Sequence, residues 1–237
     1  MRFAIDRQRK NICLAIARQK PEAVVTLLRQ AESAADLFEI RLDAFTSQPD
    51  IAFFREATDK PLLFTCRPQW EGGMFTGEET ARLEILQKAM AGGADFIDLE
   101  LKAAESMRQA LLTSCEASSC RLMLSWHDFS GTPSRQALMT IFQQMYRSGA
   151  HLGKIITTAR RFQDVLQVLS LQQEAEEMEF PLVAFCMGEA GRISRLATLE
   201  LGGFLSYAAP DEGEGTAPGQ LRATTLKRLL ELLHHEN

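Results

Sequence analysis

The sequence predicts a single (β/α)8 TIM barrel, an α/β fold of eight parallel strands with their helices. Eight short apolar runs recur along the chain, and amphipathic helical patterns separate them at steps about as long as one βα unit. Alternating strand and helix patterns imply right-handed crossovers and a parallel sheet. Eight such units close into a barrel, and 237 residues are a usual length for that fold.

Each predicted strand is a short apolar run bounded by polar or turn residues. In chain order the runs cover residues 12–17, 37–42, 61–66, 96–101, 121–126, 153–158, 181–186 and 203–208. No linker or low-complexity tract separates them, so we expect one catalytic domain over residues 1–237.

The predicted helices come from apolar residues spaced three and four positions apart. The clearest patterns cover 21–34, 81–90, 160–179 and 221–234. In the third of these we expect one inner face, made of Phe162, Val165, Leu166, Leu169 and Leu171.

The segment 209–220 interrupts the alternation, because it is acidic and rich in glycine. Glycine freedom combined with two prolines is typical of a lid over a barrel mouth. A solvated surface turn is the alternative.

Composition narrows the function classes. With 46% hydrophobic and 24% charged residues, the chain resembles an ordinary soluble globular protein. A formal net charge of −5 gives no sign of a nucleic-acid partner. No signal-peptide pattern or run of 18 apolar residues predicts a membrane association.

The five cysteines are an odd number, and three lie in apolar strand-like runs, which argues against a disulfide framework. Cys115 and Cys120 have no second ligand pair nearby, so no metal site is predicted. We therefore expect a reducing, cytoplasmic location.

Charged and polar residues gather at the carboxyl ends of the predicted strands, where barrel enzymes carry their active sites. These residues are Glu39, Arg41, Asp43, Arg67, Asp98, Glu100, His127, Asp128, Lys154, Arg192 and Arg195. The first three alternate with apolar residues, so in a strand they would share the inner face. Such charges are costly inside a barrel unless they pair with each other or with a polar ligand. A structural ion pair is thus the alternative to a binding role.

Lys154 is the most informative residue, because it stands inside an apolar predicted strand. Lysine is rarely buried without a partner, yet desolvation turns a lysine amine into a nucleophile that attacks carbonyls. The pattern indicates covalent catalysis through a Schiff base. A strand-end lysine that reaches water is the alternative.

His127 ends the fifth run, and a histidine beside Lys154 is suited to moving protons on a Schiff-base intermediate. Glu100 is the carboxylate expected to orient the ring of His127. The alternative for His127 is a structural histidine whose hydrogen bonds are satisfied by the fold. Arg67 and Arg195 offer rigid guanidinium forks for a carboxylate or phosphate. The predicted partner is thus a small, anionic molecule.

Seven fragments, in order, resemble the type I 3-dehydroquinate dehydratases over nearly the whole chain. They are FEIRLDAF (38–45), LLFTCRPQWEGG (62–73), DFIDLEL (95–101), SWHDFSGTP (125–133), GKI (153–155), MGEAGRISRLA (187–197) and TAPGQL (216–221). The resemblance implies a hydro-lyase of the shikimate pathway that uses no cofactor. Its reaction would be syn elimination of water from 3-dehydroquinate to give 3-dehydroshikimate.

The resemblance also implies residue roles. Lys154 would form the imine with the C3 ketone, His127 would act as general acid and base, and Glu100 would accompany that histidine. The residues it implies in substrate binding are Arg195 for the carboxylate, Glu39, Arg41 and Arg67 for the hydroxyls, and Thr216 and Gln220 on the lid. The residues after the lysine, including Thr157 and Thr158, depart from the family pattern, so the wall beside the imine is expected to differ. Trp126 is a second departure, since smaller residues are common before the histidine in the family.

Two other functions stay open. A Schiff-base aldolase acting on a phosphorylated sugar shares the barrel and the lysine, although no phosphate loop is evident here. A catalytically inactive binding barrel is disfavoured by the intact set of Lys154, His127 and Glu100. Self-association into a homodimer is also left open.

Overall fold

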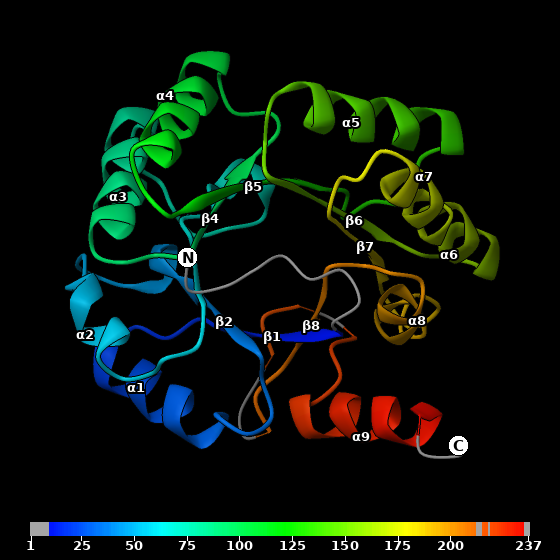
Figure 1. The fold of residues 1–237 in the computed structure, drawn as a ribbon, viewed down its shortest axis with the longest axis horizontal. Helices are drawn as coiled ribbons and strands as arrows, with labels where there is room; N and C mark the ends of the chain where they lie inside the picture. The colour runs from blue at the N-terminus through cyan, green and yellow to red at the C-terminus, as the bar shows by residue number, and fades with distance from the viewer. Residues whose placement is uncertain (1–9, 212–214, 218, 235–237) are drawn as a thin grey trace.

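The computed structural model describes residues 10–211, 215–217 and 219–234, and in them eight strands are surrounded by a ring of helices (Figure 1). The strands are β1 (Asn11–Ile16), β2 (Leu37–Arg41), β3 (Leu62–Thr65), β4 (Phe96–Glu100), β5 (Arg121–His127), β6 (Leu152–Thr158), β7 (Leu182–Met187) and β8 (Leu205–Ala208). Each predicted run matches one strand to within two residues at each end.

All pairings between these strands are parallel, in the order β7-β6-β5-β4-β3-β2-β1-β8. The outermost strands of that order, β7 and β8, contact each other, so the sheet curves into a nearly closed barrel. The predicted fold class is confirmed. Because every strand runs in the same direction, all eight carboxyl ends lie at one mouth of the barrel.

The helices cover the outside of the sheet (Figure 1). They are α1 (Pro21–Gln30), α2 (Ile51–Arg55), α3 (Glu79–Ala91), α4 (Glu105–Glu116), α5 (Arg135–Arg147), α6 (Phe162–Leu169), α7 (Leu171–Glu177), α8 (Ser194–Glu200) and α9 (Ala223–His234). Two short 3-10 turns, η1 (Leu42–Ala44) and η2 (Gln69–Glu71), follow β2 and β3. No helix in the described ranges is both long and apolar enough to cross a membrane.

The segment predicted as one helix over 160–179 is two helices, α6 and α7, which meet at Ser170. The Ser170 hydroxyl donates to the carbonyl of Gln167, a local bond that competes with a regular helix. The predicted inner face is also partly wrong. Phe162 and Leu166 are 59% and 53% exposed, whereas Val165 and Val168 are buried.

Apolar side chains form two layers. The larger one lies between strands and helices, and Ile155 of β6 belongs to it. The smaller one fills the barrel interior, where Leu152 and Ile156 lie on the opposite face of the same strand. Lys154 shares the inner face with Leu152 and Ile156, so strand alternation alone directs its amine into the barrel.

Candidate active site

A cavity opens where the carboxyl ends of the strands meet the loops that follow them. Eight of the nine residues predicted for the site line it, namely Glu39, Arg41, Arg67, His127, Lys154, Arg195, Thr216 and Gln220. The ninth, Glu100, is fully buried and does not line the cavity.

Lys154 is buried at the floor of this cavity, with 5% of its surface exposed, and does not extend to water. Its Nζ lies 3.0 Å from Tyr207 Oη and 3.1 Å from Asp98 Oδ2. Glu39 Oε1 is 3.5 Å away. These four residues come from β2, β4, β6 and β8, the alternate strands that supply one layer of side chains in such a barrel. A layer that is usually apolar is therefore polar here and is centred on an amine.

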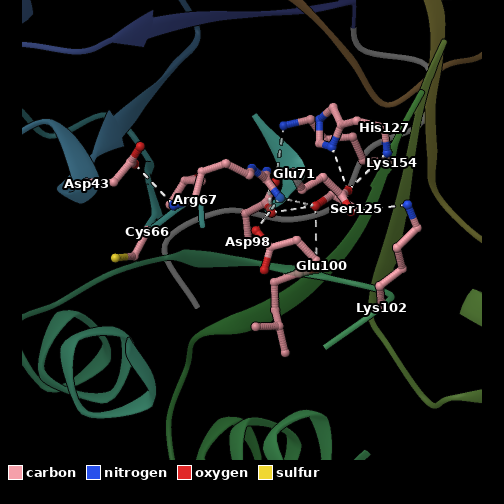
Figure 2. Close-up of polar contacts among 12 residues, drawn as sticks. Asp43, Cys66, Arg67, Glu71, Asp98, Glu100, Lys102, Ser125, His127 and Lys154 are labelled. Atoms are coloured by element: carbon pink, nitrogen blue, oxygen red, sulfur yellow. Dashed lines mark hydrogen bonds and ion pairs between the residues drawn. The ribbon is translucent and has the colours of Figure 1, made fainter. Parts of the chain in front are cut away.

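Arg67 holds the next group of charges (Figure 2). Its Nη2 donates to Asp98 Oδ1 at 2.7 Å, and its Nη1 donates to Glu100 Oε1 and Ser125 Oγ at 2.5 and 2.7 Å. Burial raises the pKa of Asp98, but the charges of Arg67 and Lys154 outweigh it and hold that pKa well below its usual range. Asp98 is therefore a fixed carboxylate that compensates two cations.

The predicted pairing of Glu100 with His127 is wrong. Glu100 uses its second oxygen to accept from the buried Arg82 at 2.5 Å, so both of its oxygens are bound to arginines. The carboxylate beside the imidazole is Glu71, whose Oε1 lies 3.0 Å from His127 Nδ1. The reason is geometric, since Glu100 and Arg82 meet inside the protein while Glu71 comes from the loop after β3.

The sequence around Glu71 shows how it is positioned. Glu71 ends η2, and Gly72 then takes the left-handed conformation with φ of 77°. A Cβ on Gly73 would lie 2.0 Å from the carbonyl oxygen of Arg67, so only glycine fits. The paired glycines thus fold the loop back and carry Glu71 into the cavity. In the sequence, an acidic residue followed by two glycines stands shortly after a predicted strand, and this pattern could have identified Glu71.

His127 is set up as a neutral base. Burial, followed by the charges of Arg67 and Lys154, lowers the pKa of His127 well below its usual value. The backbone N–H of His127 also donates to Glu71 Oε1 at 3.0 Å, so this oxygen acts as an acceptor. Nδ1 then carries the ring proton, and Nε2 keeps a lone pair. The exposed ring of Phe129 stacks on the imidazole at 6.0 Å between centroids.

Glu71 has an unusual environment of its own. Burial raises its pKa to about 7, despite the lowering effect of Arg67. Lys102, which is largely exposed, lies 3.8 Å from Glu71 Oε2. A buried carboxyl in hydrogen-bond contact with an imidazole can support that ring as it gains and loses a proton.

The charges after β2 are only partly as predicted. Glu39 and Arg41 line the cavity, but β2 ends at Arg41, so Asp43 lies in η1 rather than on the strand. Asp43 makes a two-point ion pair with Arg41, at 2.9 and 2.7 Å. Its oxygens also accept from the backbone N–H groups of Arg67 and Met74. Asp43 therefore orients Arg41 and anchors the loop after β3.

Arg195 lies at the first turn of α8, with its guanidinium carbon 4.6 Å from the centroid of the Phe185 ring. Burial lowers its pKa to about 10, so a carboxylate in the cavity would stabilise its charge. The turn before α8 is tight: a Cβ on Gly191 would lie 2.4 Å from the carbonyl oxygen of Met187. Ser194 ties the turn to β7 by accepting from the backbone N–H of Cys186.

The predicted lid segment is described only in part, because residues 212–214 and 218 lie outside the described residues. Within it, Thr216 N–H donates to Gln220 Oε1 at 2.8 Å, and Gln220 Nε2 donates to Thr216 Oγ1 at 3.1 Å. These contacts hold both side chains at the cavity.

The residues that depart from the family pattern lie outside the cavity that holds the Lys154 amine. Thr157 and Thr158 do not line the cavity; their hydroxyls contact Thr132 Oγ1 at 2.7 Å and the carbonyl of Asp128 at 3.0 Å. Trp126 packs against the outer apolar layer. Ile156 lines the cavity near the lysine instead.

Comparison with known proteins gives a consistent result. A family model described as Type I 3-dehydroquinase matches residues 12–237. The 3-dehydroquinate dehydratase of Desulfotalea psychrophila is 42% identical, over 92% of this chain and 96% of that protein. Among solved structures, 3-dehydroquinate dehydratase from Geobacillus kaustophilus has a TM-score of 0.89 at 27% identity, over 97% of this chain and 93% of the other. The Clostridium difficile type I enzyme, solved with covalently modified comenic acid, has a TM-score of 0.86 at 26% identity, over 97% and 94%.

Proposed function

We propose that this cavity carries out the reaction of the type I 3-dehydroquinase family, to which the chain belongs. That reaction is the elimination of water from 3-dehydroquinate to give 3-dehydroshikimate through a lysine Schiff base. The single observation that carries the residue assignment is the buried amine of Lys154 in the same cavity as the imidazole of His127.

Lys154 is the imine-forming residue in this proposal. Its amine attacks the C3 ketone, and the protonated imine that results is an electron sink for the carbanion formed at C2. Asp98 and Glu39 compensate the ammonium charge in the resting site. The same carboxylates also stabilise the positive charge of the iminium nitrogen.

His127 moves the protons of the elimination. With Nδ1 held by Glu71, its Nε2 takes the C2 proton and then protonates the departing C1 hydroxyl. One base on one face of the ring accounts for a syn elimination. Glu71, rather than Glu100, is the residue that orients this base.

Cationic and hydroxyl side chains position the substrate. Arg195 faces the cavity as a buried cation suited to the substrate carboxylate. Arg41, Arg67 and Glu39 provide donors and acceptors for the ring hydroxyls, and Thr216 and Gln220 close the site from the lid segment. Positioning of this kind contributes to rate by holding the reacting atoms in place.

The setting of the enzyme is also a proposal. We infer a cytoplasmic location, supported by five buried cysteines that all have free thiols. Its partner is the small-molecule substrate. A homodimer stays a prediction, which sedimentation of the purified protein would test.

The test is borohydride reduction with 3-dehydroquinate, followed by peptide mass analysis. We expect a reduced adduct on Lys154 and no adduct in Lys154→Met, which should stay folded by circular dichroism because Arg67 still compensates Asp98. Lys88→Met, at an exposed position on α3, is the matched control and should label and turn over normally. An adduct on another lysine, or none, would contradict the assignment.

A further inference from the structure

Tyr207 is placed against the reacting amine in a way that the proposed roles do not use. Its hydroxyl lies 3.0 Å from Lys154 Nζ and 3.4 Å from Glu39 Oε1. Its ring centroid is 4.3 Å from the same nitrogen. The residue is 4% exposed, and it is one of two tyrosines in the chain. A buried hydroxyl therefore bridges the amine and a carboxylate.

Imine formation sets a requirement for protons at this position. A ketone and a lysine ammonium give an iminium ion and one water molecule. One of the three ammonium protons stays on nitrogen, and the other two leave with the carbonyl oxygen. The amine must release a proton before its lone pair can attack, and that proton must return when the carbinolamine hydroxyl departs. A group in contact with Nζ must therefore accept a proton and later give it back.

The contacts of Nζ differ in their suitability for this task. Asp98 is bound by Arg67 and Ser125 as well as by Lys154, so it is committed as an anion. His127 lines the same cavity, but its Nδ1 is engaged with Glu71. Glu39 Oε1 accepts from Thr65 Oγ1 at 2.7 Å and from Tyr207, and it carries no two-point arginine contact among the described residues. Glu39 Oε1 is therefore in position to receive the hydroxyl proton of Tyr207.

We propose that Tyr207 and Glu39 form a proton relay that serves Lys154 during imine formation. This inference rests on the proposed function and adds a catalytic residue to it. As Lys154 Nζ gives a proton to Tyr207 Oη, the tyrosine passes its own hydroxyl proton to Glu39 Oε1. The free amine then bonds to C3, and the carbonyl electron pair moves to oxygen, which gains the remaining departing proton from nitrogen. The reverse transfer through Tyr207 protonates that hydroxyl, and it leaves as water.

The electrostatics of Tyr207 agree with this geometry. Burial, followed by the charge of Glu39, raises the pKa of Tyr207 well above its ordinary value. A phenol that stays neutral can accept with its oxygen while it donates its hydrogen, so it can pass a proton without becoming an anion. Tyr207 also contacts Phe185 at 6.2 Å between ring centroids, which fixes its orientation.

The test measures imine formation apart from elimination. In a His127→Ala background, where elimination is blocked, borohydride quenching at increasing times follows accumulation of the Lys154 adduct with 3-dehydroquinate. Adding Tyr207→Phe should slow that accumulation about tenfold or more, a modest share of what acid-base groups contribute. The ring and its packing remain, so the unfolding midpoint should not change. Tyr146→Phe, at the other and exposed tyrosine, should leave the rate unchanged.

A second variant keeps the test independent of one substitution. Glu39→Gln in the same background should slow adduct formation to a similar extent, and the two changes combined should be no worse than either alone, because they interrupt one path. Accumulation at the parent rate in both variants would overturn the relay while leaving the proposed function intact. Failure of the wild-type chain to form any adduct would overturn the proposed function and the relay together.

Discussion

At the residue scale, two of the three buried glutamates in the described part of the chain show how neighbours assign a role. Glu71 and Glu100 are 3% and 0% exposed and lie near the same arginine. Glu71 contacts an imidazole, and burial raises its pKa to about 7. Glu100 is bound by two guanidinium groups. The first is suited to supporting proton transfer, and the second to holding Arg67 in place.

We predict that Glu71→Gln lowers kcat by about tenfold to a hundredfold, less than loss of a whole general base. The amide no longer stabilises the protonated imidazole, so elimination slows, while KM and adduct formation on Lys154 should be unaffected. Stability should change little, because burial disfavours the charged form of Glu71 and the neutral amide has nearly the same shape. Steady-state kinetics and adduct trapping measure these effects.

Glu100→Gln serves as the contrasting variant. It leaves Arg67 and Arg82 undercompensated in the interior, and we expect it to lower the free energy of unfolding by about 3 kcal/mol. Urea unfolding would measure this loss. A turnover defect confined to Glu100→Gln, with normal kinetics in Glu71→Gln, would return the orienting role to Glu100.

At the element scale, the loops after the strands decide where the functional groups point. The η2 turn after β3 delivers Glu71, and the turn between β7 and α8 delivers Arg195. Both turns require glycine because backbone atoms approach closely. The strands fix how far along the barrel axis each residue lies. The turns after β3 and β7 decide that Glu71 and Arg195 face the cavity.

The turn before α8 gives a prediction at this scale. A Cβ on Gly191 would lie 2.4 and 2.6 Å from the carbonyl oxygens of Met187 and Cys186. Gly191→Ala should therefore displace α8 and Arg195, and we expect kcat/KM to fall about tenfold to a hundredfold. Gly131→Ala is the control, because no atom lies within 4 Å of the added Cβ. Similar kinetics in both variants would contradict the role given to this turn.

At the scale of the whole molecule, the site depends on barrel closure. β8 pairs with β1 and contacts β7, and this brings Tyr207 into the layer shared by Glu39, Asp98 and Lys154. Helix α9 packs on β1 at the same seam and buries Leu226 and Leu230. Stability at the seam and assembly of the site are therefore linked.

We predict that Leu226→Ala lowers the free energy of unfolding by about 2 to 5 kcal/mol, because it leaves a cavity under the closing strands. Leu232→Ala, on the same helix but 61% exposed, should change it by less than about 0.5 kcal/mol. Chemical denaturation followed by circular dichroism compares the two. Equal losses would mean that α9 is not anchored through its buried face.

Much of the fold was predictable because its signals are local. Strand alternation and helical spacing are properties of neighbouring residues, and eight runs sufficed to indicate the barrel. The helical pattern over 160–179 was harder to interpret, because the side-chain hydrogen bond of Ser170 interrupts it and solvent, not the sheet, covers Phe162.

The sequence by itself determined which residues reach the mouth of the barrel, since parallel strands of known period bring their carboxyl ends together. Only the tertiary structure decided which of them meet. Lys154 contacts Asp98 and Tyr207, which are 56 and 53 positions away, and His127 contacts Glu71, also 56 positions away. Such pairings depend on the curvature of the closed sheet and on the loop after β3, which no local pattern specifies. That geometry explains why Glu71, and not Glu100, contacts His127, and why Tyr207 lies beside the Lys154 amine.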